Sequence, residues 1–140
     1  MSAIHFFCED LNFDLRQKRS IRDWISAVIL DSNHKVGEIN YIFCSDDYLH
    51  SINLEYLNHD TLTDIVTFDN RSSEETIDSD IYISIQRVKA NSIELGVAFE
   101  HELHRVMIHG VLHLLGYQDK TDEQKSVMRG KEDACLSLLT

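Results

Sequence analysis

The chain has 140 residues, of which 43% are apolar, and this predicts a single domain over residues 1–140 with a substantial core. The formal net charge of −11 argues against a protein whose main task is tight binding of nucleic acid, because that affinity comes largely from basic side chains. No apolar run reaches the roughly 18 residues of a membrane span, and the first residues do not resemble a secretory signal. Because the three cysteines are far apart and form no CxxC pair, we expect neither a disulfide framework nor a Cys-rich zinc site, and we expect a cytoplasmic location.

The first half of the chain alternates strand and helix patterns. Residues 4–8 form a short apolar run that predicts a strand. Over 15–31 the apolar residues recur at helical spacing, which predicts an amphipathic helix. Residues 38–44 predict a second strand, and a helix is expected to start at 45–47 and to carry an apolar stripe up to Tyr56.

The second half begins with a polar connection over 58–63 and ends in three helices. Strands are predicted at 65–68 and 81–85, separated by a charged loop over 69–78. The three helices are expected at 86–95, at 98–115 and from Thr121 onward, where Gly96 and Gly116 end the first two and a capping box starts the third. The order β-α-β-α-β-β-α-α-α predicts an α/β or α+β domain with one mixed sheet of about four strands and about five helices.

Two histidines in the strongest predicted helix form a candidate metal site. His109 and His113 are four residues apart, so their imidazoles lie on one face of the helix, one turn from each other. Gly116 lets the chain reverse after the helix, and Asp119 can then supply an oxygen as a third ligand. Three protein ligands leave one coordination position open for water, as in a catalytic zinc site. The site is expected at the end of a central helix.

Other interpretations of this helix have to be weighed. Buried histidines need polar partners, and a metal is only one kind of partner. In HExxH metalloproteases a glutamate follows the first histidine as general base, but Gly110 occupies that position here. Gly110 instead indicates a close backbone approach or a ligand that needs the space. His101 and His104 have the wrong spacing for the protease motif and are interpreted as an exposed or outer face of the helix.

The segment 109–117 reads HGVLHLLGY, and it resembles the signature of the bacterial rRNA-maturation endoribonuclease family YbeY. Further segments are similar to that family: NLEY at 53–56 followed by Asp60, TDIVTF at 63–68, and DIYIS at 80–84, where Ser79 replaces the family's glycine. The resemblance implies a zinc-dependent endoribonuclease, with one Zn²⁺ per chain, that acts on single-stranded RNA in rRNA maturation and ribosome quality control. Its implied partners are rRNA together with ribosomal subunits or ribosomal proteins, and no membrane.

The chain departs from the family pattern at three places. The family's third histidine is replaced by Asp119, which is a legitimate zinc ligand; Asp122 or Glu123 are the nearest substitutes. Leu57 stands where the family usually has arginine, so a phosphate contact expected there is missing and His59 or another basic residue would have to replace it. In addition, Leu62 replaces a proline.

The catalytic residues implied are therefore His109, His113 and Asp119, which act through the water on the metal. The segment that contains Thr63 and Asp64 is expected to line the cleft, although these residues could equally cap turns. Tyr117 is expected either to pack in the core or to stack on a base. A basic strip at the first helix is expected to meet the RNA backbone or the ribosome, with a solvated helix face as the alternative; it consists of Arg16, Lys18, Arg19 and Arg22.

Two other functions remain open. The first is a metallohydrolase of another substrate, such as a peptide or a small phosphoester. The second is a non-enzymatic ribosome assembly factor with a structural metal, which would require a protein side chain in the fourth metal position.

Overall fold

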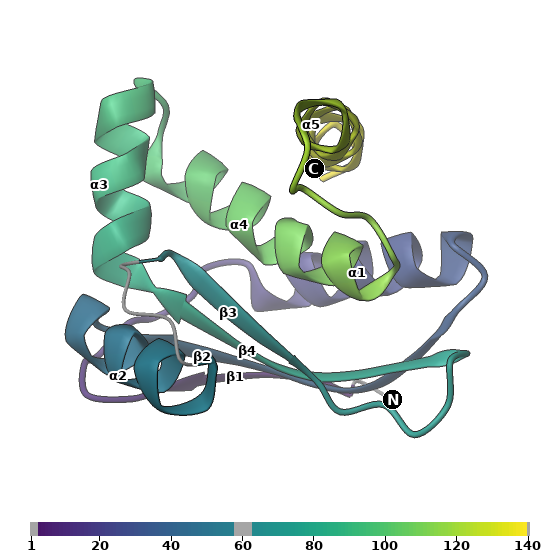
Figure 1. Cartoon of the computed structure of the whole chain (residues 1–140), viewed down its shortest axis with the longest axis horizontal. Helices are drawn as coiled ribbons and strands as arrows, with labels where there is room; N and C mark the ends of the chain where they lie inside the picture. Colours follow the sequence, from purple (N-terminus) through teal and green to yellow (C-terminus); the bar gives the residue numbers. More distant parts are fainter. Residues whose placement is uncertain (1–2, 58–62, 140) are drawn as a thin grey trace.

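The computed structural model describes residues 3–57 and 63–139. Within these residues the chain forms four strands and five helices in the predicted order (Figure 1). The elements are β1 (Ile4–Cys8), α1 (Lys18–Asp31), β2 (Lys35–Cys44), α2 (Asp46–Leu57), β3 (Ile65–Asp69), β4 (Thr76–Ser84), α3 (Ile85–Leu95), α4 (Phe99–Leu114) and α5 (Asp122–Leu136). The predicted single-domain α+β class with one mixed sheet is confirmed.

The sheet has the strand order β1-β2-β4-β3. β2 pairs in parallel with β1 and with β4, because a helix or a longer connection separates these strands in the sequence. β3 pairs antiparallel with β4, to which a short loop joins it, and Thr67 lies opposite Ile81. β3 is therefore an edge strand, and its residues line a cleft beside α4.

Helices cover the two faces of the sheet unequally. The larger core packs the apolar stripes of α1 and α4 against one face, with fully buried side chains such as Ile25, Tyr41 and Met107. A smaller core packs Leu49 and Ile52 of α2 against the opposite face. In Figure 1 α5 lies on the side of α4 away from the sheet, so α4 is enclosed between the sheet and α5.

The starts of three elements differ from the prediction by three residues or more. β2 begins at Lys35 instead of residue 38. α1 begins at Lys18 instead of residue 15, because Gln17 adopts a left-handed conformation (φ 60°) just before it. The predicted loop over 69–78 was wrong in its second part, since β4 begins at Thr76. Ser79 and Asp78 interrupt the apolar alternation there, yet Ser79 is buried and donates its hydroxyl hydrogen to the carbonyl of Phe68.

The connection from α4 to α5 follows the predicted local rules. Gly116 has φ 108°, and the amide of Tyr117 donates to the carbonyl of Leu112, which closes the end of α4. Thr121 and Gln124 form the expected capping box at the start of α5. In the described part of the chain, no helix combines the length and apolar character needed to cross a membrane.

Candidate metal centre

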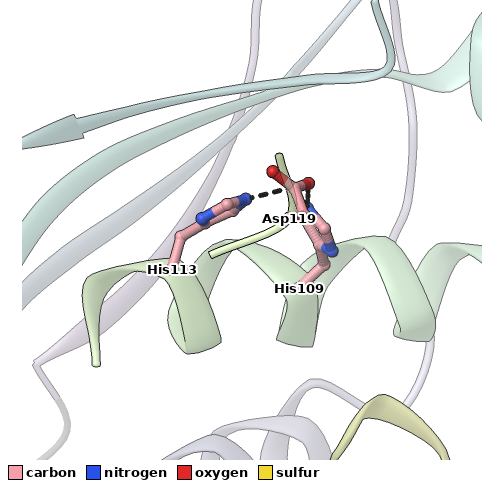
Figure 2. Close-up of side chains that lie close together, drawn as sticks. All are labelled: His109, His113 and Asp119. Atoms are coloured by element: carbon pink, nitrogen blue, oxygen red, sulfur yellow. Dashed lines mark ion pairs between the residues drawn. The ribbon is translucent and has the colours of Figure 1, made fainter. Parts of the chain in front are cut away.

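Three side chains converge at the end of α4. His109 and His113 extend from α4, and Asp119 returns toward them from the connection to α5 (Figure 2). Oδ2 of Asp119 lies 3.3 Å from Nε2 of each histidine. Donor atoms bound at about 2.1 Å to one tetrahedral ion are separated by about 3.4 Å, so the observed spacing fits a zinc-sized ion.

The local sequence explains why these atoms meet. The four-residue spacing places the two imidazoles on one face of α4, with ring centroids 4.6 Å apart and nearly perpendicular planes. The positive φ of Gly116 then turns the chain back over the last helical turn, so that Asp119 is carried toward the same point. Each of the three offers one ligand atom, and all these atoms lie within 4.8 Å of one another.

The three side chains line a cleft of about 620 Å³ between α4, β3 and the end of α2. They are partly exposed, with side-chain exposures of 17% for His109, 32% for His113 and 39% for Asp119. An ion held there is accessible from the cleft. The full lining consists of Asn53, Leu57, Thr63, Asp64, Ile65, Val66, Thr67, Asp69, His109, Gly110, His113, Leu114 and Asp119.

Gly110 allows α4 to approach the edge of the sheet closely. A Cβ atom at this position would lie 2.9 Å from Cδ1 of Ile65 and 3.1 Å from Cγ2 of Thr67. Of the two explanations open from the sequence, the close approach therefore accounts for this glycine. It brings the histidine-bearing turn of α4 against β3, whose residues form the opposite wall of the cleft.

The charge of the cleft is negative in its described lining. Asp64, Asp69 and Asp119 contribute carboxylates, and none of the described lining residues is lysine or arginine. Burial raises the pKa of Asp64, and the nearby charges of Arg105 and His109 only partly oppose this. An anionic substrate would therefore meet a repulsive surface unless a cation occupied the site.

Sequence reasoning missed one partner of the cluster. Nδ1 of His109 lies 2.5 Å from Oε2 of Glu132, which belongs to α5 and is only 1% exposed. The second oxygen of Glu132 accepts a hydrogen bond of 3.1 Å from Arg105. The sequence did hold a signal for this contact: Glu132 lies between Met128 and Cys135 at the helical spacing of the buried face of α5.

The other predicted site residues fall into three groups: those that line the cleft, those that lie elsewhere, and those outside the described residues. Thr63 and Asp64 line the cleft, as does Leu57 at the position where an arginine is usual in the resembling family. Tyr117 lies outside the cleft lining and packs against the core, with the ammonium of Lys131 5.8 Å from its ring centre. His59, Asp60 and Leu62 are outside the described residues. Asp122 and Glu123 occupy the first turn of α5 and are not part of the cluster.

The predicted basic strip does not line the cleft. Arg16 pairs with Glu100 and Lys18 with Asp14 at exposed sites. The guanidinium of Arg22 lies over the ring of Phe6. The strip, with Arg19, is thus separate from the metal cluster, and its contact with RNA stays a prediction.

Comparisons with known proteins agree on one family. Residues 4–140 match the family described as Endoribonuclease YbeY. The chain is 54% identical to the Endoribonuclease YbeY of Flavobacterium psychrophilum, over 94% of each chain. It is 50% identical to that of Cytophaga hutchinsonii, over 97% of this chain and 95% of the other. The solution structure of TM1509 from Thermotoga maritima superposes with a TM-score of 0.66 at 25% identity, covering 96% of this chain and 87% of that one.

Proposed function

The chain belongs to the Endoribonuclease YbeY family, and from this premise we propose that it is a metal-dependent endoribonuclease whose centre is formed by His109, His113 and Asp119. It hydrolyses phosphodiester bonds of RNA. The finer parts of the proposal are that the substrate is single-stranded rRNA during maturation and quality control of the ribosome, and that the resident metal is one Zn²⁺. Ribosomal subunits or ribosomal proteins as partners, and a cytoplasmic location, belong to the same proposal.

The observation that carries the proposal is the convergence of three donor atoms on one point at the wall of an open cleft. Two imidazole nitrogens and one carboxylate oxygen form a donor set that suits zinc better than magnesium or calcium, which prefer oxygen ligands only. The 3.3 Å separations match those around a tetrahedral ion. A zinc ion bound there would supply Lewis-acid polarisation of a phosphate oxygen and would make a water molecule acidic near neutral pH.

The chain's own residues fit this chemistry. His109 and His113 provide neutral ligands, and Asp119 adds one negative charge, so a divalent ion keeps a net positive charge toward the phosphate. The described cleft lining holds no lysine or arginine, which makes the ion the main attraction for the RNA backbone in that region. Asp64 lines the same cleft, and burial raises the pKa of its carboxyl group above the ordinary value.

The alternatives lack comparable support. A structural metal would need a fourth protein ligand, and in the described residues the cluster has three members beside an open cleft. A peptidase would need a base in place of Gly110, whose backbone packs against Ile65 and Thr67. These observations favour a catalytic metal centre over a structural metal and over a peptidase of the HExxH type.

The proposal is tested by replacing one ligand and one histidine outside the centre. His113→Ala should lose the bound zinc, measured by elemental analysis, and should lose cleavage of a fluorescent single-stranded RNA. His101→Ala is the matched control, because His101 lies on the same helix, is exposed and does not line the cleft. It should keep both properties. Cleavage by His113→Ala at the wild-type rate without metal would overturn the proposal.

A further inference from the structure

The two ring nitrogens of His109 face two different carboxylates. Nε2 lies 3.3 Å from Asp119 and points into the proposed metal centre. Nδ1 lies 2.5 Å from Glu132 on the opposite side of the ring. Only one nitrogen of a neutral imidazole carries a hydrogen, so the partner of Nδ1 decides whether Nε2 offers a lone pair to a metal.

A hydrogen bond from Arg105 holds the side chain of Glu132 in the position where it contacts His109. Glu132 is 1% exposed, so an ionised carboxylate there needs partners for both oxygens. Oε2 faces His109, and Oε1 accepts from Nη1 of Arg105 at 3.1 Å. Arg105 is in turn paired with Glu102, which is also 1% exposed, one helical turn away on α4.

These contacts lead to one assignment, which rests on the proposed metal centre. We propose that Glu132 is a positioning residue for zinc binding: it accepts the Nδ1 hydrogen of His109 and thereby directs the Nε2 lone pair toward the ion. Arg105 occupies the other carboxylate oxygen of Glu132, which fixes the side chain in the orientation that reaches His109. A carboxylate that orients a ligating histidine in this way supports metal affinity without touching the metal.

The neighbouring ligand shows that this device is specific to His109. His113 stands one turn later on α4 and contributes its own Nε2 to the cluster. Within residues 3–57 and 63–139, the ion pair of His113 is the one between its Nε2 and Asp119. The two imidazoles therefore differ: one is oriented by a buried carboxylate and the other is the more exposed, with 32% against 17% of the side chain accessible.

The first test measures zinc affinity by competition with a chromophoric chelator. Glu132→Gln keeps the size of the side chain, but its amide cannot present oxygen both to Arg105 and to His109. Zinc binding should weaken by about 10- to 100-fold. Glu102→Gln is the matched control, because it removes an equally buried carboxylate from the same ionic group without contacting His109. Its affinity should stay close to that of the wild type.

The outcomes separate the two proposals. A wild-type protein that binds no zinc would remove the proposed metal centre itself. Zinc binding by the wild type together with equal affinity in Glu132→Gln would overturn only the role of Glu132. An equal loss of affinity in both glutamine variants, with equally lowered unfolding temperatures of the zinc-free proteins, would also overturn it, because the effect would then be structural.

The second test needs no variant and therefore does not depend on the folding of Glu132→Gln. Nitrogen–proton correlation spectra of the histidine rings distinguish the two tautomers. In the zinc-free wild-type protein, at a pH where the ring is neutral, His109 should carry its hydrogen on Nδ1. A hydrogen found on Nε2 of His109 would overturn the assignment.

Discussion

The two sides of helix α4 hold the proposed metal ligands by different physical means. Toward the sheet, α4 packs mainly by shape: Gly110 lies against Ile65 and Thr67, and the core around it is largely apolar. Toward α5, it packs by charge: Arg105 lies between two buried glutamates, one of which reaches the ligand His109. The same helical turn is thus positioned by van der Waals contact on one side and by ion pairs on the other.

This difference sets how each side responds to substitution. Apolar packing loses stability gradually with the volume that is added or removed. A buried ion pair responds abruptly, because removing one partner leaves an uncompensated charge in a medium that solvates it poorly. The hydrogen bonds and charge of Glu102, together with Glu132, raise the pKa of Arg105 despite its partial burial, so this guanidinium stays charged at every accessible pH.

The largest effect is expected from breaking the charged side. Arg105→Met should lower the free energy of unfolding by about 3–5 kcal/mol, because Glu102 and Glu132 would lose their common cation while both remain buried. Urea unfolding of the zinc-free protein would measure this. The change should also weaken the packing of α5 on α4, since Glu132 belongs to α5.

The matched control applies the same substitution to an exposed pair. Arg16 and Glu100 are 3.3 Å apart, with 77% and 46% of their side chains exposed. Arg16→Met should change the free energy of unfolding by less than about 1 kcal/mol. If the two variants lose equal stability, the distinction between the charged side and an ordinary surface pair is wrong.

An intermediate effect is expected from the side that packs by shape. Gly110→Val places a branched side chain where even a Cβ would meet Ile65 and Thr67, so it should cost about 1–3 kcal/mol of unfolding free energy. Gly110→Ala should be milder, because the end of the Ile65 side chain can move and alanine favours the helix by about 1 kcal/mol over glycine. Thermal unfolding of both variants checks the order. A greater loss in the alanine variant would contradict packing by shape.

The sequence was sufficient to predict the part of the site whose residues are close together in the chain. The spacing of His109 and His113, the reversal at Gly116 and the return of Asp119 are all encoded within eleven residues, and the structure brings the three together. The element order was equally accessible, because helical and strand periodicities are local signals.

The charged side was not accessible in the same way. Glu132 reaches His109 across 23 positions of sequence, and only the packing of α5 on α4 brings them together. The basic strip shows the opposite limit of sequence reasoning. Arg16 and Lys18 are neighbours in the sequence and suggested an RNA-binding surface, but neither lines the cleft. The start of β4 at Thr76 was missed because polar residues interrupt the apolar alternation there, while the strand is formed by pairing with the distant residues Lys35 and Val36 of β2.

The smallest effect concerns Asp64, whose carboxyl group has a raised pKa and lies on the side of α4 that packs by shape. Burial raises the pKa of Asp64 above its ordinary value of 3.8. A carboxyl group with a raised folded-state pKa contributes stability that is present below pH 3.8 and is lost as the pH rises through the folded-state pKa. Asp64→Asn should therefore be more stable than the wild type at pH 7, and the difference should fade as the pH falls toward 3.8.

Asp69, at the other end of β3, provides a control of opposite sign. A hydrogen bond from Arg71 lowers the pKa of Asp69, so its contribution to stability is present above pH 3.8 and is lost as the pH falls through the lowered value. Asp69→Asn should thus be slightly less stable than the wild type at pH 7. Urea midpoints of both variants across this pH range test the pair. An Asp64→Asn protein that is less stable than the wild type at pH 7 would show that the carboxylate of Asp64 stabilises the fold, and that the sheet side of α4 also depends on charge.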